Sequence, residues 1–286
     1  MQDIYSKHDL YNILKTNGIH LTKSRGQNFL LDKNLLQKLI RAADIKTEDH
    51  IIEIGGGIGH LTAFLASSGA HITVFEIDKK LAALLQKEYQ EHPQVEIVCM
   101  DFLKANLRDY IPLNHRSVKI LANIPYHITT PILEHCFKEI DIINSMILTV
   151  QKEFAQRITA HHNDPQYSSL SIYCKAYSTN KLLFVLSDKA FYPQPKVESA
   201  AVYFDLTSKN PLNIQDHTLF TKILRAIFSS RRKTIYNSLS KSPFLDLNPE
   251  ILKKVLSQLE IDPGIRGESL SAESLAKLCN LLYQMS

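Results

Sequence analysis

The chain lacks long hydrophobic runs. No apolar stretch in its 286 residues approaches the roughly 20 residues that a membrane-spanning helix needs. The first residues, MQDIYSKHDLYNIL, carry charges between their apolar positions, which excludes a secretory signal of the usual kind. Because 44% of the residues are hydrophobic, the chain can still fill a core, and we expect a globular, cytoplasmic protein.

Cysteine is also scarce. The four cysteines are widely separated: Cys99, Cys136, Cys174 and Cys279. No pair has the spacing of a zinc site or a redox motif, so we expect reduced, partly buried thiols. His161, His162 and Asp164 lie close together in the sequence, but HExxH-type spacing is missing. We therefore expect a solvated loop there and no metal.

The net charge is small, at +4, and it is unevenly distributed. Residues 1–207 hold 22 basic and 22 acidic residues, whereas residues 208–286 hold 11 basic and 7 acidic ones. A basic C-terminal part suits a polyanionic partner, although so small a surplus serves solubility equally well.

Strand-like and helix-like segments alternate through most of the chain. The predicted strands are Ile51–Ile54, Ile72–Glu76, Val95–Cys99, Val118–Ala122, Met146–Val150, Leu182–Leu186 and Ala200–Leu206. The predicted helices lie near 33–43, 59–68, 79–90, 129–139, 151–160 and 167–177, and Asp32 and Asp78 are expected to cap two of them. This alternation predicts an α/β fold with a parallel, doubly wound sheet. The last two strands have no helix between them and are expected to form an antiparallel pair.

The pattern changes near both ends of the chain. Residues 1–22 are expected to form a leader with a short helix over Tyr5–Asn17, and residues 23–207 the α/β domain. The sequence SKNP at 208–211 is typical of a linker. Residues 208–286 then predict a small all-helical domain, with helices near 217–239, 249–259 and 271–283.

Residues 51–62, IIEIGGGIGHLT, are the most informative segment. A β-branched run ends at Glu53, and glycines follow at 55, 56, 57 and 59. Such a loop lets a nucleotide-like ligand lie against bare backbone. The dinucleotide fingerprint needs a glycine at position 60, where His60 stands, so the loop favours S-adenosylmethionine (SAM) over a nicotinamide dinucleotide. Taken alone, a tight turn without a ligand explains the loop as well.

Acidic residues stand at the ends of the next two predicted strands: Glu76 ends the second strand, and Asp101 follows the third. Glu76 lies 21 residues after Gly55, where a carboxylate can accept hydrogen bonds from both ribose hydroxyls. Asp101 can accept from an adenine amine, and the Phe102 ring can cover the base. Each residue also has a plainer explanation, as a surface acid or a core aromatic. Their order at successive strand ends indicates a cofactor site, because α/β sheets bind ligands at that edge.

Asn123-Ile124-Pro125-Tyr126 follows the fourth predicted strand. The amine of adenine is a weak nucleophile because its lone pair is delocalised into the ring. The Asn123 side-chain carbonyl and a backbone carbonyl near Ile124–Pro125 can hold both N–H bonds and turn the lone pair toward a methyl donor. Proline fixes the turn, and Tyr126 can stack on an extruded base. This segment predicts methyl transfer to adenine, although the four letters alone also suit an ordinary proline turn.

Two later segments are further candidates. Phe191, in AFYPQPKVES, can cover the other face of the base, where stacking contributes about 1–3 kcal/mol, or it can fill the core. The helix expected over 217–239 places four basic residues on one side: Lys222, Arg225, Arg232 and Lys233. Arg231 falls nearer the apolar side of this helix. A basic helical face suits RNA phosphates, and it also suits a solvated surface.

Together these segments resemble the ribosomal RNA small-subunit adenine N6,N6-dimethyltransferase family, the dimethyladenosine transferases. The resemblance covers nearly the whole chain from Lys23 onward. It rests on GQNFL at 26–30, EIGGGIGHLT at 53–62, EID at 76–78, DFL at 101–103, NIPY at 123–126, QKEFAQR at 151–157, AFYPQPKVES at 190–199, FSSRRKTIYNSL at 228–239 and RGESL at 266–270.

The resemblance implies a Rossmann-like SAM-binding sheet followed by a small helical domain. It also implies that the enzyme dimethylates two adjacent adenosines in a loop near the 3′ end of 16S rRNA. The substrate would be an immature small ribosomal subunit, so the enzyme would also have a role in subunit biogenesis. Four SAM molecules would become S-adenosylhomocysteine, and we expect a monomer.

The resemblance also implies roles for single residues. Asn28 and Leu30 would line the SAM pocket, Gly55 would lie under its amino-acid end, and Tyr126 and Phe191 would sandwich the target base. The cofactor candidates are Asn28, Leu30, Gly55, Gly57, Glu76, Ile77, Asp101, Phe102 and Asn123. The catalytic candidates are Asn123, Pro125, Tyr126 and Phe191. The RNA-binding candidates are Lys222, Arg225, Arg231, Arg232 and Lys233.

The chain departs from the family pattern at two positions. Arg25 stands where the family usually has an aromatic residue, and Gly56 replaces the usual proline of the glycine loop. The first departure concerns how the N-terminal segment closes over the cofactor. The second is expected only to loosen the turn.

Three other interpretations stay open. The macrolide-resistance branch of the family methylates large-subunit rRNA with similar motifs, but FSSRRKTIYNSL and RGESL favour the small-subunit type. A non-catalytic assembly or transcription factor on the same fold is disfavoured by the intact Asn123, Pro125 and Tyr126. A dehydrogenase is disfavoured by the missing GxGxxG and by the presence of NIPY.

Overall fold

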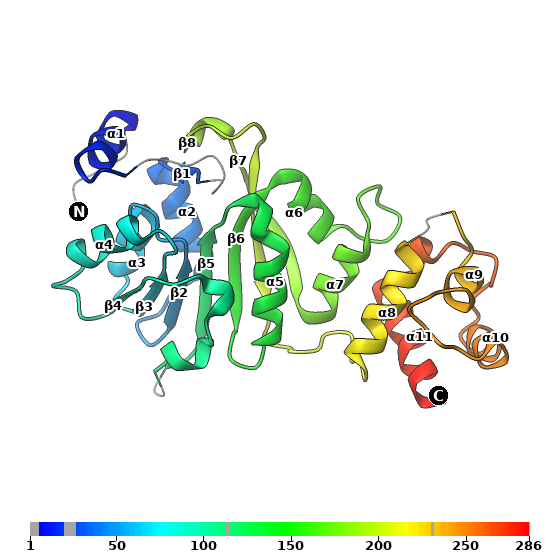
Figure 1. Cartoon of the computed structure of the whole chain (residues 1–286). Coiled ribbons are helices and arrows are strands. Elements are labelled where there is room, and N and C mark those ends of the chain that lie inside the picture. The colour runs from blue at the N-terminus through cyan, green and yellow to red at the C-terminus, as the bar shows by residue number, and fades with distance from the viewer. Residues whose placement is uncertain (1–5, 20–26, 113–114, 230–231, 286) are drawn as a thin grey trace. The chain divides into compact units, whose positions relative to one another are not determined.

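Figure 1 shows the computed structural model, which describes residues 6–19, 27–112, 115–229 and 232–285. The chain forms two compact units, Met1–Ala155 with Lys181–Thr207 and Gln156–Asn180 with Ser208–Ser286. The change of unit after Thr207 lies where the sequence predicts a linker. The helical unit also takes in residues 156–180, which the sequence pattern groups with the α/β domain.

The first unit is built on a seven-stranded sheet with the strand order β4-β3-β2-β5-β6-β9-β7. Its strands are β2 (His50–Ile54), β3 (His71–Phe75), β4 (Val95–Val98), β5 (Val118–Asn123), β6 (Ser145–Gln151), β7 (Thr179–Leu186) and β9 (Ser199–Asp205). The five strands from β4 to β6 pair in parallel, and β9 is antiparallel to β6. The predicted α/β fold with a parallel sheet is confirmed, and β7 and β9 are neighbours as expected.

Helices cover both faces of this sheet (Figure 1). The helices are α2 (Lys33–Ala43), α3 (His60–Ala66), α4 (Lys79–Glu88) and α5 (Thr129–Lys138). Helix α6 (Lys152–Thr159) follows β6 directly and contains the change from the first unit to the second. Helices α2, α3 and α4 share one apolar cluster with the sheet. On the other face, Phe137 of α5 meets Phe204 of β9 edge to face, with ring centroids 6.4 Å apart.

Aspartates begin two of these helices, as predicted. The Asp32 side chain accepts hydrogen bonds from the amides of Asn34 and Leu35, and Asp78 caps α4 in the same way. Each cap satisfies backbone donors that have no partner inside the helix. Short 3₁₀ turns link other elements: η2 (Phe102–Lys104), η3 (Leu107–Tyr110), η4 (Tyr126–Ile128) and η5 (Asp188–Ala190).

The N-terminal leader contains the short helix that the sequence predicts, α1 (Lys7–Thr16). Leu10 and Leu14 of this helix are buried in a cluster with Ile58 of the glycine loop and Leu81 of α4. The described part of the leader therefore packs as part of the α/β unit.

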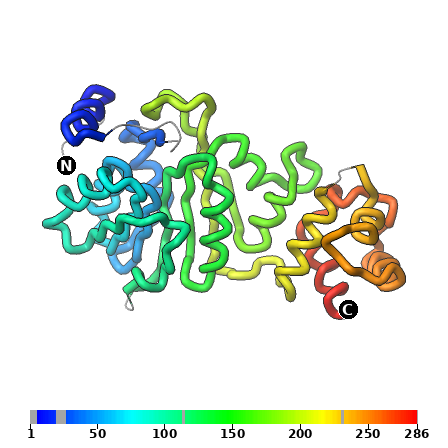
Figure 2. The backbone as a smooth tube through the Cα atoms, viewed as in Figure 1, coloured from blue at the N-terminus to red at the C-terminus, as the bar shows by residue number. Residues whose placement is uncertain are grey.

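A second, two-stranded sheet joins segments that are far apart in the sequence (Figure 2). It pairs β1 (Phe29–Leu30) with β8 (Phe191–Tyr192) in antiparallel register. The Leu31 amide extends the contact by donating to the Ala190 carbonyl at 2.9 Å. The GQNFL and AFYPQPKVES motifs are therefore tied together by backbone hydrogen bonds.

The second unit is helical. Its helices are α7 (Ser169–Tyr177), α8 (His217–Phe228), α9 (Ile235–Ser240), α10 (Pro249–Gln258) and α11 (Ala272–Met285), with a 3₁₀ turn, η6 (Gly267–Ser269). Their apolar faces form one buried cluster. A Cβ on Gly267 would lie 2.4 Å from Cγ2 of Ile227, so the RGESL motif needs glycine for η6 to approach α8 this closely.

The single helix predicted over 217–239 is wrong. Helix α8 ends at Phe228 with Ser229 as its C-cap, and α9 begins only at Ile235. The Thr234 side chain caps α9 by accepting from the Asn237 amide at 3.3 Å. Serine and threonine hydroxyls compete with helical hydrogen bonds, and they lie at both ends of this break.

No helix within the described ranges is long and apolar enough to cross a membrane. The four cysteines are unpaired thiols, with Cys99 exposed and the other three buried, which agrees with the sequence-based expectation.

His50, the first residue of β2, is a buried histidine at the amino-terminal edge of the sheet. It is 2% exposed, and its Nε2 lies 3.1 Å from the Thr73 hydroxyl. Burial, with smaller effects from His115 and His71, lowers the pKa of His50 from 6.5 to about 4. Between these pH values the unfolded chain binds a proton that the folded protein does not.

We predict that acidification weakens the fold through His50. As the pH falls below 6.5, this group removes up to about 1.4 kcal/mol of unfolding free energy per pH unit, because the unfolded chain gains the proton first. The His50→Gln protein lacks this effect. Urea denaturation of both proteins should therefore show the wild type losing stability relative to the variant between pH 6.5 and 4.5. A constant difference over that range would contradict the assignment.

Candidate active site

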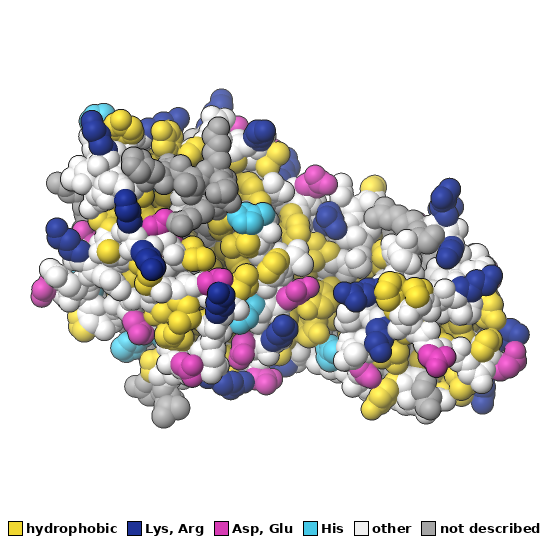
Figure 3. Space-filling model, in the orientation of Figure 1, with side chains coloured by type: hydrophobic (Ala, Val, Ile, Leu, Met, Phe, Trp, Pro, Cys, Tyr) yellow, Lys and Arg dark blue, Asp and Glu magenta, His cyan; other side chains and the backbone are white. Residues whose placement is uncertain are grey.

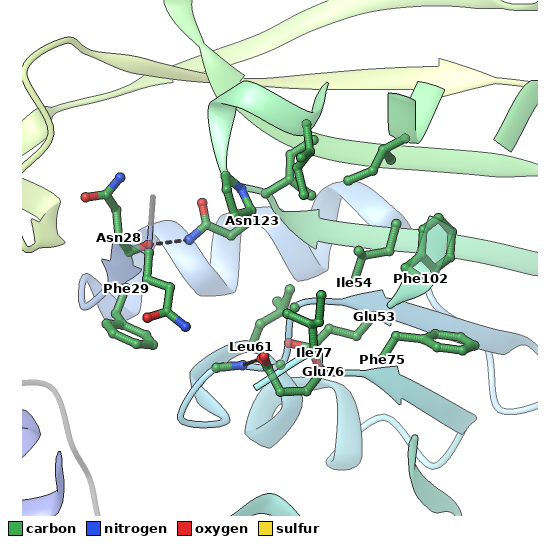
Figure 4. Close-up of a pocket in the computed structure, with 18 of the residues that line it drawn as sticks. Asn28, Phe29, Glu53, Ile54, Leu61, Phe75, Glu76, Ile77, Phe102 and Asn123 are labelled. Carbon is green, nitrogen blue, oxygen red and sulfur yellow. Dashed lines mark hydrogen bonds between the residues drawn. The ribbon is translucent and has the colours of Figure 1, made fainter. Parts of the chain in front are cut away.

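A cavity lies at the carboxyl ends of β2, β3 and β5 (Figure 4). Its volume is about 1200 Å³ with the solvent at its mouth included. It is lined by all the cofactor candidates: Asn28, Leu30, Gly55, Gly57, Glu76, Ile77, Asp101, Phe102 and Asn123. Pro125 and Tyr126 line it as well.

The glycine loop needs its glycines for two different reasons. Gly55 has φ +79° and Gly57 has φ +58°, in the left-handed region that residues with a Cβ avoid. Gly56 is needed for packing, because a Cβ there would lie 2.5 Å from Cγ1 of Val74 and 2.7 Å from Cδ1 of Leu85. The sequence suggested that Gly56 only loosens the turn. The structure shows a further role, because the missing Cβ lets the loop pack directly on β3 and α4.

Glu76 follows β3 directly, and the backbone holds both of its carboxylate oxygens. Oε2 accepts from the Gly57 amide at 2.8 Å, and Oε1 accepts from the Asp78 amide at 2.8 Å. Each carboxylate oxygen has more than one lone pair, so the same group can also accept from two ligand hydroxyls. Glu76 therefore fixes the glycine loop to β3 and presents an oriented acceptor to the cavity.

Glu53, at the end of β2, is a second carboxyl group of the cavity wall. It is 1% exposed, and its Oε2 accepts from the Thr62 hydroxyl at 2.7 Å. Burial raises the pKa of Glu53 from 4.5 to about 8, and nearby Glu76 adds to the rise, while the Thr62 bond opposes it. The side chain is therefore mostly protonated at pH 7.

The side of the cavity beyond β4 combines an acid with apolar surface. Asp101 accepts through Oδ1 from the Leu103 amide at 3.1 Å. Phe102 is buried and meets Phe75 edge to face, with ring centroids 5.5 Å apart. Ile77 and Met100 line the cavity while 59% and 37% exposed. This exposed apolar surface beside a carboxylate suits a flat base with an amine group.

Asn123, the last residue of β5, is held by a segment that precedes the sheet in the sequence. Its Nδ2 donates to the Asn28 carbonyl at 2.9 Å (Figure 4). A carbonyl can only accept, so the side-chain nitrogen of Asn123 must face the Asn28 carbonyl. The side-chain oxygen of Asn123 then points away from Asn28. The side-chain carbonyl of Asn123 is thus oriented as an acceptor at the cavity wall.

Tyr126 is fixed at both ends. Its backbone carbonyl accepts from the Thr129 hydroxyl at 3.0 Å, and its phenol oxygen lies 2.7 Å from Oγ of Ser199. One residue before Tyr126, the Pro125 carbonyl accepts from the Ile128 amide at 3.2 Å. The NIPY turn therefore fixes the backbone of Tyr126, and the contact with Ser199 fixes the far end of its ring.

Phe191 is the one catalytic candidate outside the cavity lining. It lies in β8 opposite Leu30 and is 1% exposed. In this structure the Phe191 ring fills the core, which was the alternative to stacking on the base.

The basic candidates belong to the helical unit. Lys222 and Arg225 are exposed on α8, and Arg232 and Lys233 are exposed in the segment before α9, so the four do not form one helical stripe. Arg231 lies outside the described residues. Lys and Arg side chains are spread over the face of this unit drawn in Figure 3, with Asp and Glu among them.

Three residues of interest were not singled out for these roles by the sequence. Glu53 is part of the glycine-loop motif. Its position at the end of a β-branched run could have indicated a buried carboxyl group. Ser199 is adjacent to Tyr126 only in three dimensions. Arg266 is brought beside the basic segment by a backbone bridge to Thr234.

The fold and the cavity define the class of protein: an α/β protein of the SAM-dependent methyltransferase type. The sequence matches the family model described as ribosomal RNA adenine dimethylase over residues 19–284. The chain belongs to the ribosomal RNA adenine dimethylase family. It is therefore an enzyme that dimethylates adenine in ribosomal RNA.

Individual relatives agree with this membership. The chain is 39% identical to the ribosomal RNA small subunit methyltransferase A of Streptococcus sanguinis, over 94% of each chain. It is 35% identical to the protein of the same name from Clostridium botulinum, over 92% of this chain and 94% of the relative.

Two solved structures share the fold. A dimethyladenosine transferase from Plasmodium falciparum matches with a TM-score of 0.75 and 25% identity, over 88% of this chain and 96% of its own. The 23S rRNA methyltransferase ErmE matches with a TM-score of 0.69 and 24% identity, over 90% of this chain and 100% of its own.

We predict that Glu53 makes the ligand-free fold less stable as the pH rises. The unfolded chain releases this proton near pH 4.5 and the folded protein near pH 8, so unfolding free energy falls between those values by up to about 1.4 kcal/mol per pH unit. Glu53→Gln removes the titrating group and keeps an acceptor for Thr62. In urea denaturation, the unfolding free energy of the variant should rise relative to that of the wild type from pH 6 to 8. If the two proteins change in parallel, Glu53 is ionised in the fold and the assignment is wrong.

Proposed function

We propose that the enzyme uses SAM to dimethylate the N6 amines of two adjacent adenosines near the 3′ end of 16S rRNA, in the small ribosomal subunit. The observation that carries the proposal is the oriented amide of Asn123 beside a cavity lined by the glycine loop, Glu76 and Asp101. The relatives named small subunit methyltransferase A support the choice of subunit. The cytoplasm is the compartment in which this substrate is assembled, and we propose that the enzyme acts there as a monomer.

The cavity fits SAM at several points. Gly55 has open space where a Cβ would stand, so a ligand can lie against its backbone. We assign the ribose hydroxyls to Glu76, the adenine amine to Asp101, and the faces of the adenine to Ile77 and Phe102. Gln27–Leu30 and Gly57 complete the wall.

The chain's own residues prepare the target amine. Asn123 accepts one N–H through its side-chain carbonyl. A backbone carbonyl of the NIPY turn is the second acceptor, and we choose that of Ile124 because the Pro125 carbonyl already uses one of its two lone pairs on the Ile128 amide. Holding both N–H bonds turns the nitrogen lone pair away from the ring and stabilises the positive charge that develops on nitrogen. Tyr126 supplies a wall for the base.

Held by Glu76 and Asp101, SAM would supply the methyl group: the lone pair of the target nitrogen would form the new bond to the methyl carbon, the electrons of the broken carbon–sulfur bond would remain on sulfur, and the nitrogen would lose a proton to water. The residues described above contribute mainly by positioning. No side chain of the site has to act as a strong base.

The helical unit offers a surface for RNA phosphates. Arg232 and Lys233 are exposed just before Thr234, and the bridge from Thr234 to Arg266 adds a third cation next to them. Arg266 approaches Glu268 only to 4.0 Å, and such an exposed pair leaves its charge available. We propose that these residues, with Lys222 and Arg225, bind rRNA backbone.

The direct test is methyl transfer from labelled SAM to unmethylated small subunits and, in parallel, to large subunits, with product nucleosides identified by mass. We expect N6,N6-dimethyladenosine in small-subunit rRNA. Product in large-subunit rRNA alone would place the enzyme in the resistance branch. SAM binding without any product would indicate a non-catalytic assembly factor.

We predict that Asn123→Ala keeps SAM affinity within a few-fold and lowers turnover by roughly a hundredfold or more, as for loss of an acceptor that stabilises developing charge. Isothermal titration measures the affinity, and single-turnover methylation of small subunits measures the rate. Asn34→Ala, an asparagine exposed on α2 away from the cavity lining, is the control and should leave the rate unchanged. If Asn123→Ala turns over at the wild-type rate, Asn123 does not have the proposed role of accepting from the target amine.

We predict that the Arg232→Glu/Lys233→Glu double variant binds small subunits more weakly and with a smaller dependence on salt. Each phosphate that the variant no longer neutralises should lower the slope of log affinity against log salt by about 0.7–0.9. The Lys254→Glu variant, on exposed α10 of the same unit, is the matched control. Equal slopes for wild type and double variant would make the segment an ordinary solvated surface.

A further inference from the structure

The contact between Tyr126 and Ser199 links the NIPY turn, which follows β5, to β9, which lies two strands away in the sheet. The phenol oxygen of Tyr126 lies 2.7 Å from Oγ of Ser199, and Ser199 is fully buried as the first residue of β9. Burial raises the pKa of Tyr126, so the phenol keeps its proton and can donate. Tyr126 itself is only half-buried and lines the cavity.

Ser199 is a rigid anchor because it belongs to the ladder between β6 and β9. It pairs with Gln151 at the end of the β6–β9 ladder. The residue after β6, Lys152, is also joined to the residue before β9, Glu198. The Lys152 amide donates to the Glu198 carbonyl at 3.0 Å, and Lys152 Nζ lies 2.8 Å from Glu198 Oε2. The hydroxyl of Ser199 therefore stays where the backbone of the sheet places it.

This anchor restricts the one motion that the NIPY turn leaves to Tyr126. The Thr129 hydroxyl holds the backbone carbonyl, but it does not fix the torsions of the side chain. A hydrogen bond at the far end of the ring does so, because both the position and the tilt of the ring plane then have to satisfy it. Without it, the half-buried ring can turn toward solvent.

Fixing the ring matters more for the second methyl transfer than for the first. Adenine enters the first transfer with two N–H bonds, which the carbonyls of Asn123 and Ile124 can both hold. Each transfer replaces one N–H by N–CH₃, so the monomethylated base has a single N–H and loses one of the two hydrogen bonds. Its orientation then depends more on contact with the Tyr126 ring.

We propose that Ser199 is a positioning residue that, through its hydrogen bond to Tyr126, favours the second methyl transfer on each adenosine. The proposal rests on the proposed function, since it concerns the two steps of that reaction. Ser199 does not touch the base. It acts through the ring that does.

The test compares product ratios in wild type and Ser199→Ala. Each protein is given unmethylated small subunits and excess SAM, and N6-methyl- and N6,N6-dimethyladenosine are quantified by mass at equal total methyl transfer. We expect the monomethyl share to rise by roughly three- to tenfold in Ser199→Ala, the rate equivalent of one hydrogen bond. SAM affinity should stay within twofold. A general loss of stability would slow both transfers and leave the ratio unchanged.

Ser145→Ala is the matched control. Ser145 is also a buried serine that hydrogen-bonds a tyrosine, Tyr203, and it lies at the other end of the same β6–β9 ladder. This variant should keep the wild-type product ratio. A rise equal to that of Ser199→Ala would overturn the proposal, because it would assign the effect to weakening of the ladder in general.

Tyr126→Phe tests the same bond from its other end and keeps the ring. It should raise the monomethyl share as Ser199→Ala does, and the double variant should be no worse than either single one. Additive effects, or an unchanged ratio in both single variants, would refute the positioning role. If the wild type makes no dimethyladenosine on small subunits, the proposed function itself fails, and the two failures are thereby distinguished.

Discussion

The register of three parallel strands is the constraint on which the site depends. Strand β2 pairs with β3 on one side and β5 on the other, so that Ile54 lies opposite both Phe75 and Ala122. The chain therefore leaves all three strands at one edge, where the glycine loop, Glu76 and Asn123 surround a single cavity. A slip of one residue in either pairing would turn these side chains to the other face of the sheet.

Hydrogen bonds between loops then turn this shared edge into a prepared site. Glu76 holds the Gly57 amide, Asn28 holds the amide of Asn123, and Ser199 holds the phenol of Tyr126. Each bond joins segments that are distant in the sequence, and each orients a group that the proposed chemistry needs. The ligand-free protein therefore already carries much of the order that methyl transfer requires, which lowers the cost of reaching a reactive geometry.

The sequence predicted most of this because the signals are local. Alternating apolar segments located the strands, aspartates marked the starts of α2 and α4, and residues at strand ends identified the cavity wall. The break between α8 and α9 was missed, since no glycine or proline marks it and only Ser229 and Thr234 do. The pKa of Glu53, the packing of Gly56 on Val74 and the Tyr126–Ser199 bond depend on tertiary neighbours, which a single sequence does not reveal.

The proposed chemistry requires that the Asn28 carbonyl orients the Asn123 amide so that the amide oxygen receives the target amine. A crystal structure of the protein with S-adenosylhomocysteine and adenosine in the target position tests it most directly. We expect the adenosine N6 to lie within hydrogen-bond distance of Asn123 Oδ1 while Nδ2 remains on the Asn28 carbonyl. An adenosine bound with its N6 away from Asn123, or an amide that has left Asn28 and turned its nitrogen to the base, would contradict it.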